Sequence, residues 1–581
     1  MALARVFALM LSDAEAVGDV VTVTTTSVTN ALVEWKTSLD NHSQSILSSW
    51  VGTDPCNRWI GIGRHKSIRG IAYVNLTSLA LRGTLHSFNF SSFQHLEKLD
   101  LSNNILFVNI PSNLGMLKSL NALDLSVNNL TGSIPTTIGD LSNLTTLCLH
   151  HNMLSGSIPR EIGMLKSLND LQLSGHNLTG SIPTTIGDLG NLTTLYLYDN
   201  MLFGSIPREM GMLKSLNGLV LSGNNLTGLI PTTIGDLGNL ITLYLDNNML
   251  SGSIPREIGM LKSLIFLALS YNNLTGSIPG SIRNLKNLTT LYLGVNELTG
   301  SIPREIGMLK SLNDLDLSIN NLTGPIPTTI GDLANLTTLY LRHNMLSRYI
   351  PREIGMLKSL NSLSLSGNNL IGPIPTTIED LGNLTTLYLH HNMLSGSIPR
   401  EIGILTSLNY LALSSNNLTG TIPLTIGNFT KLTTLALHGN LFSGLLPPEI
   451  GKLKSLRDLC LFSNKFYGSI PQEMNNLTHL RLLALSDNKF INHFPDNTCL
   501  GGLLEKDCGC GRDGGTPKTM AGLIFWSLRE KVVYREAGGQ GWAVIVCCAR
   551  WVLREFARVA AKKVAGTEGG DVLGFLVPWM Y

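Results

Sequence analysis

Tyrosine, histidine and arginine side chains recur at regular spacing along the middle of the chain, and they are the first candidates for chemistry. Tyrosine returns every 48 residues, and doublets that contain histidine follow two of these tyrosines. Histidine is a common zinc ligand and general base, whereas an exposed tyrosine is a rigid aromatic anchor with a polar tip. The residues that this pattern selects as a ligand-binding hypothesis are Tyr196, Tyr244, Tyr292, Tyr340, Arg342, His343, Tyr388, His390 and His391.

The other candidates for catalysis or metal binding are weak. Among the 8 cysteines Cys547 and Cys548 are adjacent, and apart from them only Cys499, Cys508 and Cys510 lie close together. A zinc site needs two ligand pairs at set spacing; a disulfide from Cys499 to Cys508 is an alternative. A G-x-G-x-x-G sequence ends at Gly514, but Pro517 follows where a helix or strand should, and no kinase motif accompanies it. No Ser/His/Asp set or carboxylate pair is arranged for catalysis. The sequence therefore predicts no enzyme, no cofactor and no metal site.

A strict repeat of 24 residues must position these side chains. Proline recurs at this interval from Pro111 to Pro495, and seven residues before each proline the chain has asparagine, except at His176. Seventeen units run from Leu96, and a degenerate unit from Ile71 precedes them. The repeating asparagines are Asn104, Asn128, Asn152, Asn200, Asn224, Asn248, Asn272, Asn296, Asn320, Asn344, Asn368, Asn392, Asn416, Asn440, Asn464 and Asn488.

Each unit reads L-x-x-L-x-L-x-x-N-x-L-x-x-x-I-P-x-x-I-G-x-L-x-x, which predicts one turn of a solenoid. The L-x-L period of two predicts a short strand with its leucines inward, and stacked turns make a parallel sheet. The buried asparagine predicts a ladder of amide hydrogen bonds to neighbouring turns, so His176 is the expected weak point. Ile-Pro keeps the return extended, and I-G-x-L predicts a short helical or 3-10 turn. The expected fold is an α/β repeat solenoid with a concave parallel β-sheet and short helical or 3-10 convex turns.

Composition and charge exclude several other classes of protein. Charged residues make up 14% of the chain and apolar residues 43%, against about 25% charged residues in ordinary domains, so long disorder and charged coiled coil are excluded. Lys and Arg total 42 against 40 Asp and Glu, which gives no reason to expect nucleic acid as a partner. The longest uncharged apolar runs are shorter than the roughly 18 residues that span a bilayer, so no transmembrane helix is predicted.

The repeat resembles the plant-type extracellular leucine-rich repeats of receptor-like kinases, whose signature L-x-G-x-I-P appears at Leu130, Gly132, Ile134 and Pro135. The resemblance covers about 480 of the 581 residues. It implies a right-handed superhelix of horseshoe shape. It also implies an ectodomain truncated before the membrane helix and kinase domain that the family carries.

The N-terminal flank resembles the capping segment of the same family. The second cap cysteine of the family is missing, because Gly63 and Arg64 stand where it would fall. Cys56 therefore has no obvious local partner, and the cap is expected to lose roughly the 2 to 4 kcal/mol that a disulfide contributes. The residues that carry this resemblance are Trp35, Trp50, Pro55, Cys56, Trp59 and Gly61.

Four segments are expected along the chain. The first resembles a signal peptide, since Arg5 precedes the apolar run Val6 to Leu11. The last contains Arg550 and Arg554 beside Trp551, which indicates either a basic amphipathic helix at a membrane surface or an ill-formed or misread C-terminus. The expected segments are a signal peptide at 1–16, an N-terminal cap at 17–70, about 18 leucine-rich repeats at 71–500 and a non-repeat tail at 507–581.

Sequons for N-glycosylation support an extracellular or cell-surface protein of the secretory pathway. Many of them are products of the repeated N-L-T-G and N-L-T-T sequences, so their number also reflects duplication. They are predicted on the surface of the turns, as glycan acceptors must be. The candidates are Asn41, Asn75, Asn89, Asn129, Asn143, Asn177, Asn191, Asn225, Asn273, Asn287, Asn321, Asn335, Asn383, Asn417, Asn428 and Asn476.

The tyrosines are predicted to share one outward column of the concave sheet, where neighbouring strands stand about 4.8 Å apart. Rigid aromatics are favoured anchors for peptides and proteins, although pairwise duplication of units would also copy tyrosine without selection. The doublets at 342–343 and 390–391 lie two strands, about 10 Å, apart, which is too far to share one zinc ion. Their histidines titrate near pH 6.5, which predicts an acidic ligand that binds more tightly in mild acid.

Two classes of function follow. The resemblance implies a receptor-like protein of cell-surface signalling that binds a peptide or protein on its concave face, with a leucine-rich-repeat co-receptor kinase as a further partner. The family's Arg-x-Arg pair is absent, since Arg342 stands beside Tyr340 and His343. The alternative is a soluble secreted inhibitor or decoy that binds a foreign enzyme. Arg348 and Tyr349, which replace a Gly-Ser pair, predict a local surface change rather than a break in the stack.

Overall fold

The computed structural model describes residues 26–64 and 70–491, and the signal-peptide and tail predictions lie outside these residues. The chain separates into two compact units that divide between Leu360 and Asn361. Within the described residues, no helix has both the length and the apolar character needed to cross a membrane.

The first unit begins with a cap built on tryptophan. The chain is helical over residues 26–38, and the rings of Trp50 and Trp59 stack with centroids 5.3 Å apart. Each indole donates to a backbone carbonyl, as in Trp35 Nε1 to Thr84 (2.8 Å) and Trp50 Nε1 to Ile60 (3.0 Å). These buried rings close the first turn without a disulfide. The remaining cap elements are α2 (Asn41–Ile46), η1 (Leu47–Ser49), α3 (Pro55–Arg58) and β1 (Ile62–Arg64), and β1 pairs antiparallel with β2.

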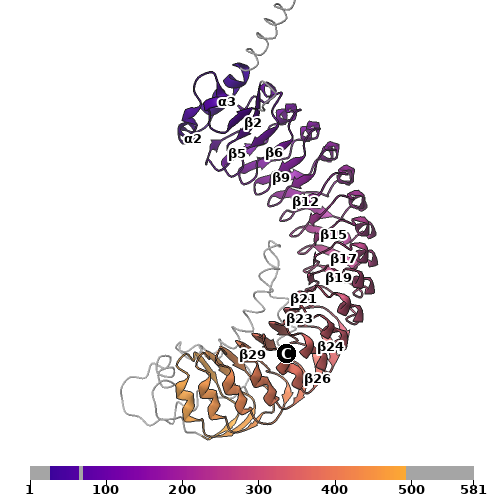
Figure 1. The fold of residues 1–581 in the computed structure, drawn as a ribbon, viewed down its shortest axis with the longest axis vertical. Coiled ribbons are helices and arrows are strands. Elements are labelled where there is room, and N and C mark those ends of the chain that lie inside the picture. The colour runs from indigo at the N-terminus through magenta and orange to yellow at the C-terminus, as the bar shows by residue number, and fades with distance from the viewer. Residues whose placement is uncertain (1–25, 65–69, 492–581) are drawn as a thin grey trace, which may run out of the picture. The chain divides into compact units, whose positions relative to one another are not determined.

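The inner sheet of the first unit takes one three-residue strand from almost every repeat. Each strand is parallel to the next with a register of one repeat, as in Leu171 opposite Leu195, and the central leucines are fully buried. Within this unit the inner sheet lines the inner side of the curve (Figure 1). Its parallel strands are β2 (Ile71–Asn75), β4 (Lys98–Asp100), β6 (Ala122–Asp124), β8 (Thr146–Cys148), β10 (Asp170–Gln172), β12 (Thr194–Tyr196), β14 (Gly218–Val220), β16 (Thr242–Tyr244), β18 (Phe266–Ala268), β20 (Thr290–Tyr292), β21 (Asp314–Asp316) and β23 (Thr338–Tyr340).

A second set of short strands follows the asparagines of the first unit. These strands also pair in parallel with those of neighbouring repeats, in short separate sheets. They are β3 (Arg82–Gly83), β5 (Ile105–Asn109), β7 (Asn129–Gly132), β9 (Met153–Ser157), β11 (Asn177–Thr179), β13 (Phe203–Gly204), β15 (Asn225–Leu229), β17 (Met249–Ser253), β19 (Asn273–Thr275), β22 (Thr323–Gly324) and β24 (Met345–Arg348).

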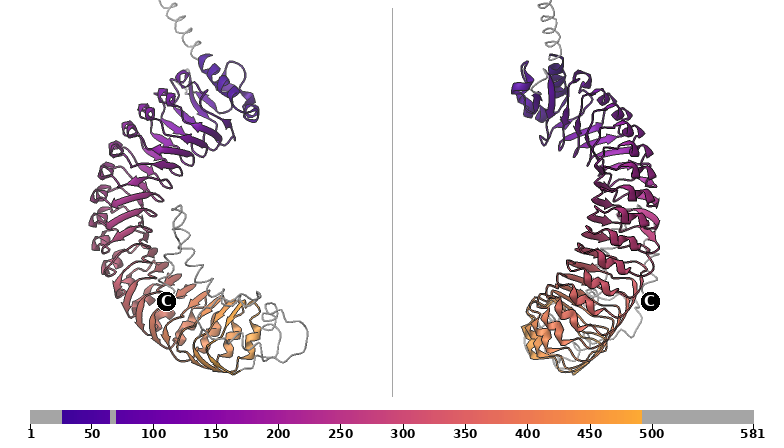
Figure 2. Two further views of the ribbon diagram at one scale, coloured as in Figure 1. Left: turned by 180° about the vertical axis from the view of Figure 1, so that it is seen from behind. Right: turned by 45° about the vertical axis from the view of Figure 1, so that its right-hand side comes forward.

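The outer side of each repeat is a 3-10 turn. Except at Phe90–Ser92, which follows Asn89, each turn follows a proline held in the extended region. The bonds of a turn span three residues, as in Ile138 N–H to Pro135 and Leu141 N–H to Ile138. Figure 2 shows these turns stacked one after another on the outer side of the first unit. They are η2 (Phe90–Ser92), η3 (Ser112–Met116), η4 (Thr136–Asp140), η5 (Arg160–Met164), η6 (Thr184–Asp188), η7 (Arg208–Met212), η8 (Thr232–Asp236), η9 (Arg256–Met260), η10 (Gly280–Asn284), η11 (Arg304–Met308), η12 (Thr328–Asp332) and η13 (Arg352–Met356).

The second unit repeats the same architecture, and phenylalanines enter the core of its last turns. Phe442, Phe466 and Phe490 stack in consecutive turns with centroids 6.1 and 6.2 Å apart. Its inner strands are β25 (Ser362–Ser364), β27 (Thr386–Tyr388), β29 (Tyr410–Ala412), β31 (Thr434–Ala436), β33 (Asp458–Cys460) and β35 (Leu482–Ala484). The others are β26 (Asn369–Gly372), β28 (Met393–Gly396), β30 (Asn417–Leu418), β32 (Ser443–Gly444), β34 (Lys465–Gly468), β36 (Lys489–Phe490), η14 (Thr376–Asp380), η15 (Arg400–Ile404), η16 (Leu424–Asn428), η17 (Pro448–Lys452) and η18 (Gln472–Asn476).

The repeating asparagines connect the turns through their side-chain amides. Asn320 is typical: its Nδ2 donates to the carbonyls of Leu293 (3.0 Å), Leu317 (3.2 Å) and Ser318 (3.2 Å). Its Oδ1 accepts the backbone N–H of Leu298 at 2.9 Å. One buried side chain therefore satisfies backbone donors and acceptors that the solenoid would otherwise leave without partners.

His176 makes only part of this connection. Its Nδ1 accepts the backbone N–H of Asn152 at 3.2 Å, so the proton of the neutral ring lies on Nε2, which is buried without a hydrogen-bond partner. Because Nδ1 already accepts this bond, the ring has no acceptor left for the backbone N–H of Leu154. In other repeats the corresponding leucine N–H donates to the asparagine Oδ1, as Leu130 does to Asn152. Burial is the main cause that lowers the pKa of His176, to about 4.

The turn at Arg348 and Tyr349 keeps its place in the first unit. β24 pairs in parallel with β22, and Leu346 and Ile350 are buried. Arg348 has φ 72, a left-handed conformation that glycine adopts at the equivalent position of other repeats, such as Gly324 with φ 74. The change is local and on the surface, as the sequence predicts.

Candidate ligand-binding face

The inner sheet of the first unit brings four of the selected tyrosines into one column. Strand register places Tyr244 opposite Val220 and Ala268, and Tyr292 opposite Ala268 and Asp316. Tyrosine therefore occupies alternate strands, about 10 Å apart, with small or acidic residues between. The column of tyrosines, named here the tyrosine stripe, comprises Tyr196, Tyr244, Tyr292 and Tyr340.

The stripe is half-buried and lies among carboxylates. Burial, followed by the charge of Asp246, raises the pKa of the Tyr244 hydroxyl. Burial, followed by the charges of Asp314 and Asp316, raises the pKa of Tyr292, whose side chain is 39% exposed. These rings therefore stay neutral and present hydrogen-bonding tips to any ligand on the inner face.

Three further side chains gather beside the stripe. Burial, then the charge of Asp316, raises the pKa of Tyr271, while the Arg342 guanidinium opposes this shift. A Cβ added at Gly294 would lie 3.1 Å from Asp316 Oδ1, so the glycine leaves room for this carboxylate. Asp316 Oδ1 also accepts the backbone N–H of Ser318 at 2.8 Å. Tyr271, Asp316 and Arg342 form an acid–base–aromatic group that is called the Asp316 cluster below.

The sequence selected Arg342 for this face but not Tyr271 or Asp316. Tyr271 precedes the repeating asparagine, in a left-handed slot (φ 56) that many residue types share. Asp316 stands in the tyrosine column, in a repeat that reads Asn-Asp-Leu-Asp-Leu. The only signal available was that both residues depart from the copies of their repeat.

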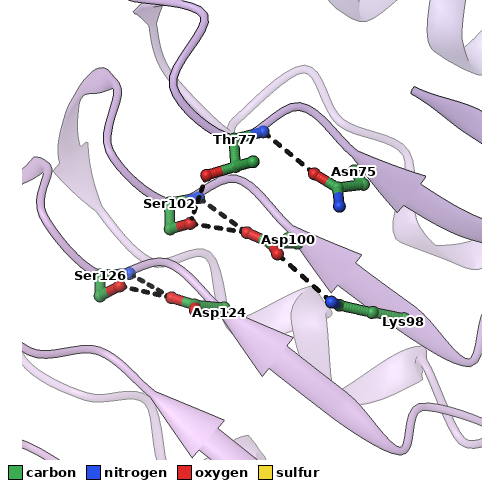
Figure 3. A network of polar contacts seen from close by, with 7 residues as sticks. All are labelled: Asn75, Thr77, Lys98, Asp100, Ser102, Asp124 and Ser126. Carbon is green, nitrogen blue, oxygen red and sulfur yellow. Dashed lines mark hydrogen bonds and ion pairs between the residues drawn. The ribbon is translucent and has the colours of Figure 1, made fainter. Parts of the chain in front are cut away.

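At the N-terminal end of the sheet the carboxylates are used locally. Asp100 accepts the hydroxyl of Ser102 (2.7 Å) and pairs with Lys98 (3.4 Å), and Asp124 accepts the hydroxyl of Ser126 at 2.6 Å (Figure 3). These bonds hold the turn after each strand. They leave Asp100 and Asp124 less available to a ligand than Asp316.

The neighbouring thiol of Cys148 is unreactive. Cys148 follows Asp124 in the same column and is buried. Burial, with the charges of Asp124, Asp170 and Asp100, raises the pKa of Cys148 to about 12. A thiol that keeps its proton is a poor nucleophile and a poor metal ligand.

The remaining selected residues lie in the second unit. Tyr388 and His390 are in edge-to-face contact with centroids 5.8 Å apart, and His390 contacts His391 at 5.4 Å. Tyr388 also packs against a cluster of Ala412, Ala436 and Cys460. Of the nine residues selected from the sequence, Tyr388, His390 and His391 belong to the second unit and the other six to the first.

The predicted titration of the histidines is wrong for His391. Burial of part of its ring lowers the pKa of this exposed side chain below the ordinary value of 6.5. His391 therefore gains its proton at a lower pH than the sequence predicts. Within residues 26–64 and 70–491, no group of three or more His, Cys, Asp or Glu side chains is placed to hold a metal ion.

The sequons that the N-L-T-T and N-L-T-G sequences of the repeat produce fall into two structural classes. In the N-L-T-T class the asparagine Nδ2 donates to the lysine carbonyl of the preceding turn, as in Asn143 to Lys118 at 2.9 Å and Asn287 to Lys262 at 3.1 Å. In the N-L-T-G class the asparagine is exposed at the start of the second strand, as at Asn225. Both classes are on the surface.

Comparison with known families identifies the repeat. A family model described as "Leucine-rich repeat region" matches residues 74–199, 269–393 and 387–501, and a second, "Leucine rich repeat", matches 214–274. The model "Leucine rich repeat N-terminal domain" matches residues 29–63. The chain belongs to the leucine-rich repeat family, and the predicted fold class is confirmed.

Within this family the chain is similar to plant receptors. It is 46% identical over 92 residues to a "probable leucine-rich repeat receptor-like protein kinase" of Arabidopsis thaliana, a match covering 15% of this chain and 8% of the relative. It is 40% identical over 79 residues to "MDIS1-interacting receptor like kinase 2" of the same plant, covering 13% and 7%. The matches thus span less than a tenth of either relative.

Solved ectodomains match over much more of the chain. The structure titled "PEPR1-AtPEP1" is 32% identical, with a TM-score of 0.73, and the match covers 80% of this chain and 72% of that one. The Arabidopsis receptor kinase HAESA, solved with the peptide hormone IDA and the co-receptor SERK1, is 33% identical, with a TM-score of 0.68 and coverage of 80% and 82%. The predicted resemblance to plant receptor ectodomains is confirmed.

Proposed function

We propose that this chain is the ligand-binding part of a receptor-like protein at the plant cell surface. In this proposal its first unit binds an extended peptide or protein segment along the inner face. The observation that carries the proposal is the tyrosine stripe, in which Tyr244, Tyr292 and Tyr340 stand in register on alternate strands. Rigid, partly exposed aromatics are the usual anchors of such interfaces.

The related ectodomains support this role. PEPR1 was solved with AtPEP1, and HAESA was solved with a peptide hormone and a co-receptor. A peptide ligand and a leucine-rich-repeat co-receptor kinase are the corresponding partners proposed here. The role is one of binding rather than catalysis, and the exposed sequons fit a protein exposed to the secretory pathway and the cell exterior.

The charges on the inner face favour a ligand that carries basic side chains. Asp246, Asp314 and Asp316 lie beside the stripe, against one guanidinium at Arg342. A lysine or arginine of the ligand would contact a carboxylate and the face of a tyrosine ring at once. This proposal replaces the acidic ligand expected from the sequence.

The part of the stripe next to the Asp316 cluster, from Tyr244 to Tyr340, sets the length of the ligand. From Tyr244 to Tyr340 there are four strand intervals of about 4.8 Å, or roughly 20 Å in all. An extended chain covers this distance with about six residues. The binding segment is therefore short, and flanking residues of the ligand would lie beyond the stripe.

The test is a binding assay on the secreted full chain with an immobilised library of synthetic seven-residue peptides. We expect lysine- and arginine-containing peptides to be enriched. Tyr292→Ala and Asp316→Asn should each weaken the best peptide about tenfold, as truncated anchors commonly do. Tyr349→Ala is the matched control, because this tyrosine is 59% exposed in the first unit but lies after β24, outside the inner sheet.

Two results would contradict the proposal. One is a loss below about 0.5 kcal/mol, little more than twofold, for both inner-face variants. The other is enrichment of acidic peptides, which would refute the assigned charge of the ligand while leaving the tyrosine stripe to be tested separately by Tyr292→Ala.

A further inference from the structure

The outer surface of the first unit carries a regular set of ion pairs between adjacent turns. In alternate repeats a lysine after one 3-10 turn reaches the aspartate that ends the next. Each lysine also donates to the backbone carbonyl of that aspartate, as Lys214 does to Asp236 at 3.3 Å. The pairs are Lys118–Asp140 (3.8 Å), Lys166–Asp188 (3.6 Å), Lys214–Asp236 (3.5 Å) and Lys310–Asp332 (3.6 Å).

One repeat breaks this arrangement. In the sibling turn η8 the sequence is Thr-Thr-Ile-Gly-Asp followed by Leu-Gly-Asn, whereas η10 reads Gly-Ser-Ile-Arg-Asn followed by Leu-Lys-Asn. Arg283 and Lys286 thus replace glycines, and Asn284 replaces the aspartate that Lys262 would contact. Each of these three differences makes the turn more positively charged than its sibling.

The result is an uncompensated basic patch. Lys262, Arg283 and Lys286 are exposed, and none of their side-chain nitrogens takes part in the ion pairs or hydrogen bonds of the described residues. The arginines of the flanking turns do not share this property, since Arg256 is held by Glu257 (3.1 Å) and Arg304 by Glu305 (3.6 Å).

The cations also form a row. Lys262, Lys286 and Lys310 occupy the same position in three consecutive turns. Elsewhere in the unit a lysine at this position alternates with a small residue, such as Gly238 or Ala334. The ammonium groups therefore follow the axis along which the repeats stack, with Arg283 beside them; of the three lysines, Lys310 also pairs with Asp332 (3.6 Å). They are named here the lysine row.

We propose that the lysine row binds a linear anionic polysaccharide. Like charges on neighbouring turns repel one another, and bound anions would remove this repulsion. A stiff chain with a carboxylate on each sugar matches cations fixed on successive turns and loses little conformational freedom on binding. The exposed amides of Asn284 and Asn287 lie in the same turns and offer partners for sugar hydroxyls. This site is independent of the ligand proposed for the inner face.

A glycan at Asn287 would compete for the same surface. Asn287 is a sequon next to Lys286, and its Nδ2 already donates to the Lys262 carbonyl at 3.1 Å. The secreted protein is therefore assayed both as produced and as Asn287→Gln. The proposal requires binding in the Asn287→Gln protein, and equal or weaker binding where Asn287 carries a glycan.

The test measures binding of the full chain to immobilised polygalacturonate, with neutral dextran as the reference surface. The variant R283G/N284D/K286G restores the residues of the sibling turns, so its repeat should fold normally. We expect it to bind about five- to tenfold more weakly, since three exposed ionic contacts each contribute a modest amount. Raising the salt from about 0.05 to about 0.3 M should weaken the original chain strongly and the variant little.

Lys118→Ala/Lys166→Ala/Lys214→Ala is the matched control, because it removes three lysines that already have carboxylate partners. Its binding should fall less than about twofold. Equal losses in the two triple variants would overturn the proposal, as would absence of binding by the original chain. Equally tight binding to polyglutamate would show that the row does not select a polysaccharide, and would overturn the assignment of the partner.

Discussion

Replacing His176 by asparagine should stabilise the turns around it, because the ring fills only part of the role of the repeating amide. An asparagine at this position would offer Oδ1 to the backbone N–H of Leu154, by analogy with Asn152 and Leu130 (2.9 Å). It would also remove the buried Nε2 donor that has no partner. Hydrogen bonds of this kind contribute about 1 kcal/mol each, and an orphan donor costs about 1 to 3 kcal/mol. The expected gain near pH 7.5 is therefore about 1 to 3 kcal/mol.

The gain should grow in acid. The folded-state pKa of His176 is about 4, whereas the ordinary value is 6.5. Between pH 6.5 and 4 the unfolded chain therefore binds a proton at His176 that the folded chain does not bind. The contribution of neutral His176 to the free energy of unfolding is fully present above pH 6.5 and is lost as the pH drops toward 4. The shift corresponds to about 3 kcal/mol in full and about 2 kcal/mol at pH 5. His176→Asn should lose this part of the pH dependence.

The measurement is hydrogen exchange of the backbone amides in the repeats from Asn128 to Asn200, followed between pH 5 and 7.5 after correction for intrinsic rates. A local method is needed because long repeat arrays need not unfold in one step. His438, whose pKa burial also lowers to about 4, is present in both proteins, so their difference isolates His176. Asn200→His is the reciprocal control and should destabilise its turn. Faster exchange in His176→Asn at pH 7.5, or an unchanged pH dependence, would refute the reasoning.

Four further predictions concern single positions. Arg348→Gly should raise the melting temperature or leave it equal, because it relieves about 1 kcal/mol of left-handed backbone strain, which the conformational entropy of glycine in the unfolded chain offsets. A clear fall in the melting temperature would contradict the assigned strain. Val108→Gly (φ 70) should raise the melting temperature more, because valine is β-branched. Asn320→Ala should cost about 2 to 4 kcal/mol and expose its turn to hydrogen exchange, because it removes the partner of the Leu298 N–H and of the Leu293 and Leu317 carbonyls. In the folded chain at pH 8, Cys148 should resist iodoacetamide, and rapid alkylation would contradict its burial and raised pKa.

Much of the fold was predictable because the repeat fixes both the period and the direction of the side chains. Leu171 and Leu195 had to face the core and pair in register, since each strand recurs after one turn. The choice between an α-helical and a 3-10 turn was left open, because a five-residue segment after proline satisfies either pattern. The backbone conformation of Arg348 could not be predicted from the sequence either, since only the structure shows that the chain keeps the left-handed conformation there without glycine.

The candidate site was predictable only in part. The tyrosine column followed from strand register, so Tyr292 and Tyr340 were placed correctly on the inner face. The Asp316 cluster was missed because it depends on side chains from three different repeats whose charges act on one another, with room left for Asp316 by Gly294. No spacing along the chain encodes that convergence, and the pKa of His391 likewise depends on burial that the sequence does not show.

Pairwise duplication divides the surface residues of this chain into those that were copied and those that differ from the copies, and the two kinds differ in how strongly they indicate a binding role. A residue that recurs every 48 positions, such as Tyr244 or Tyr292, can be inherited from a copied pair of repeats without any role of its own. Asp316 and Arg283 break that period, so copying alone does not explain them. If the inner face and the lysine row are functional, substitutions at these non-repeating residues should impair binding more than substitutions at Tyr196, the repeated tyrosine farthest from the Asp316 cluster. Equal sensitivity at Tyr196 and Asp316 would show that the repeated column, rather than its departures, determines the ligand.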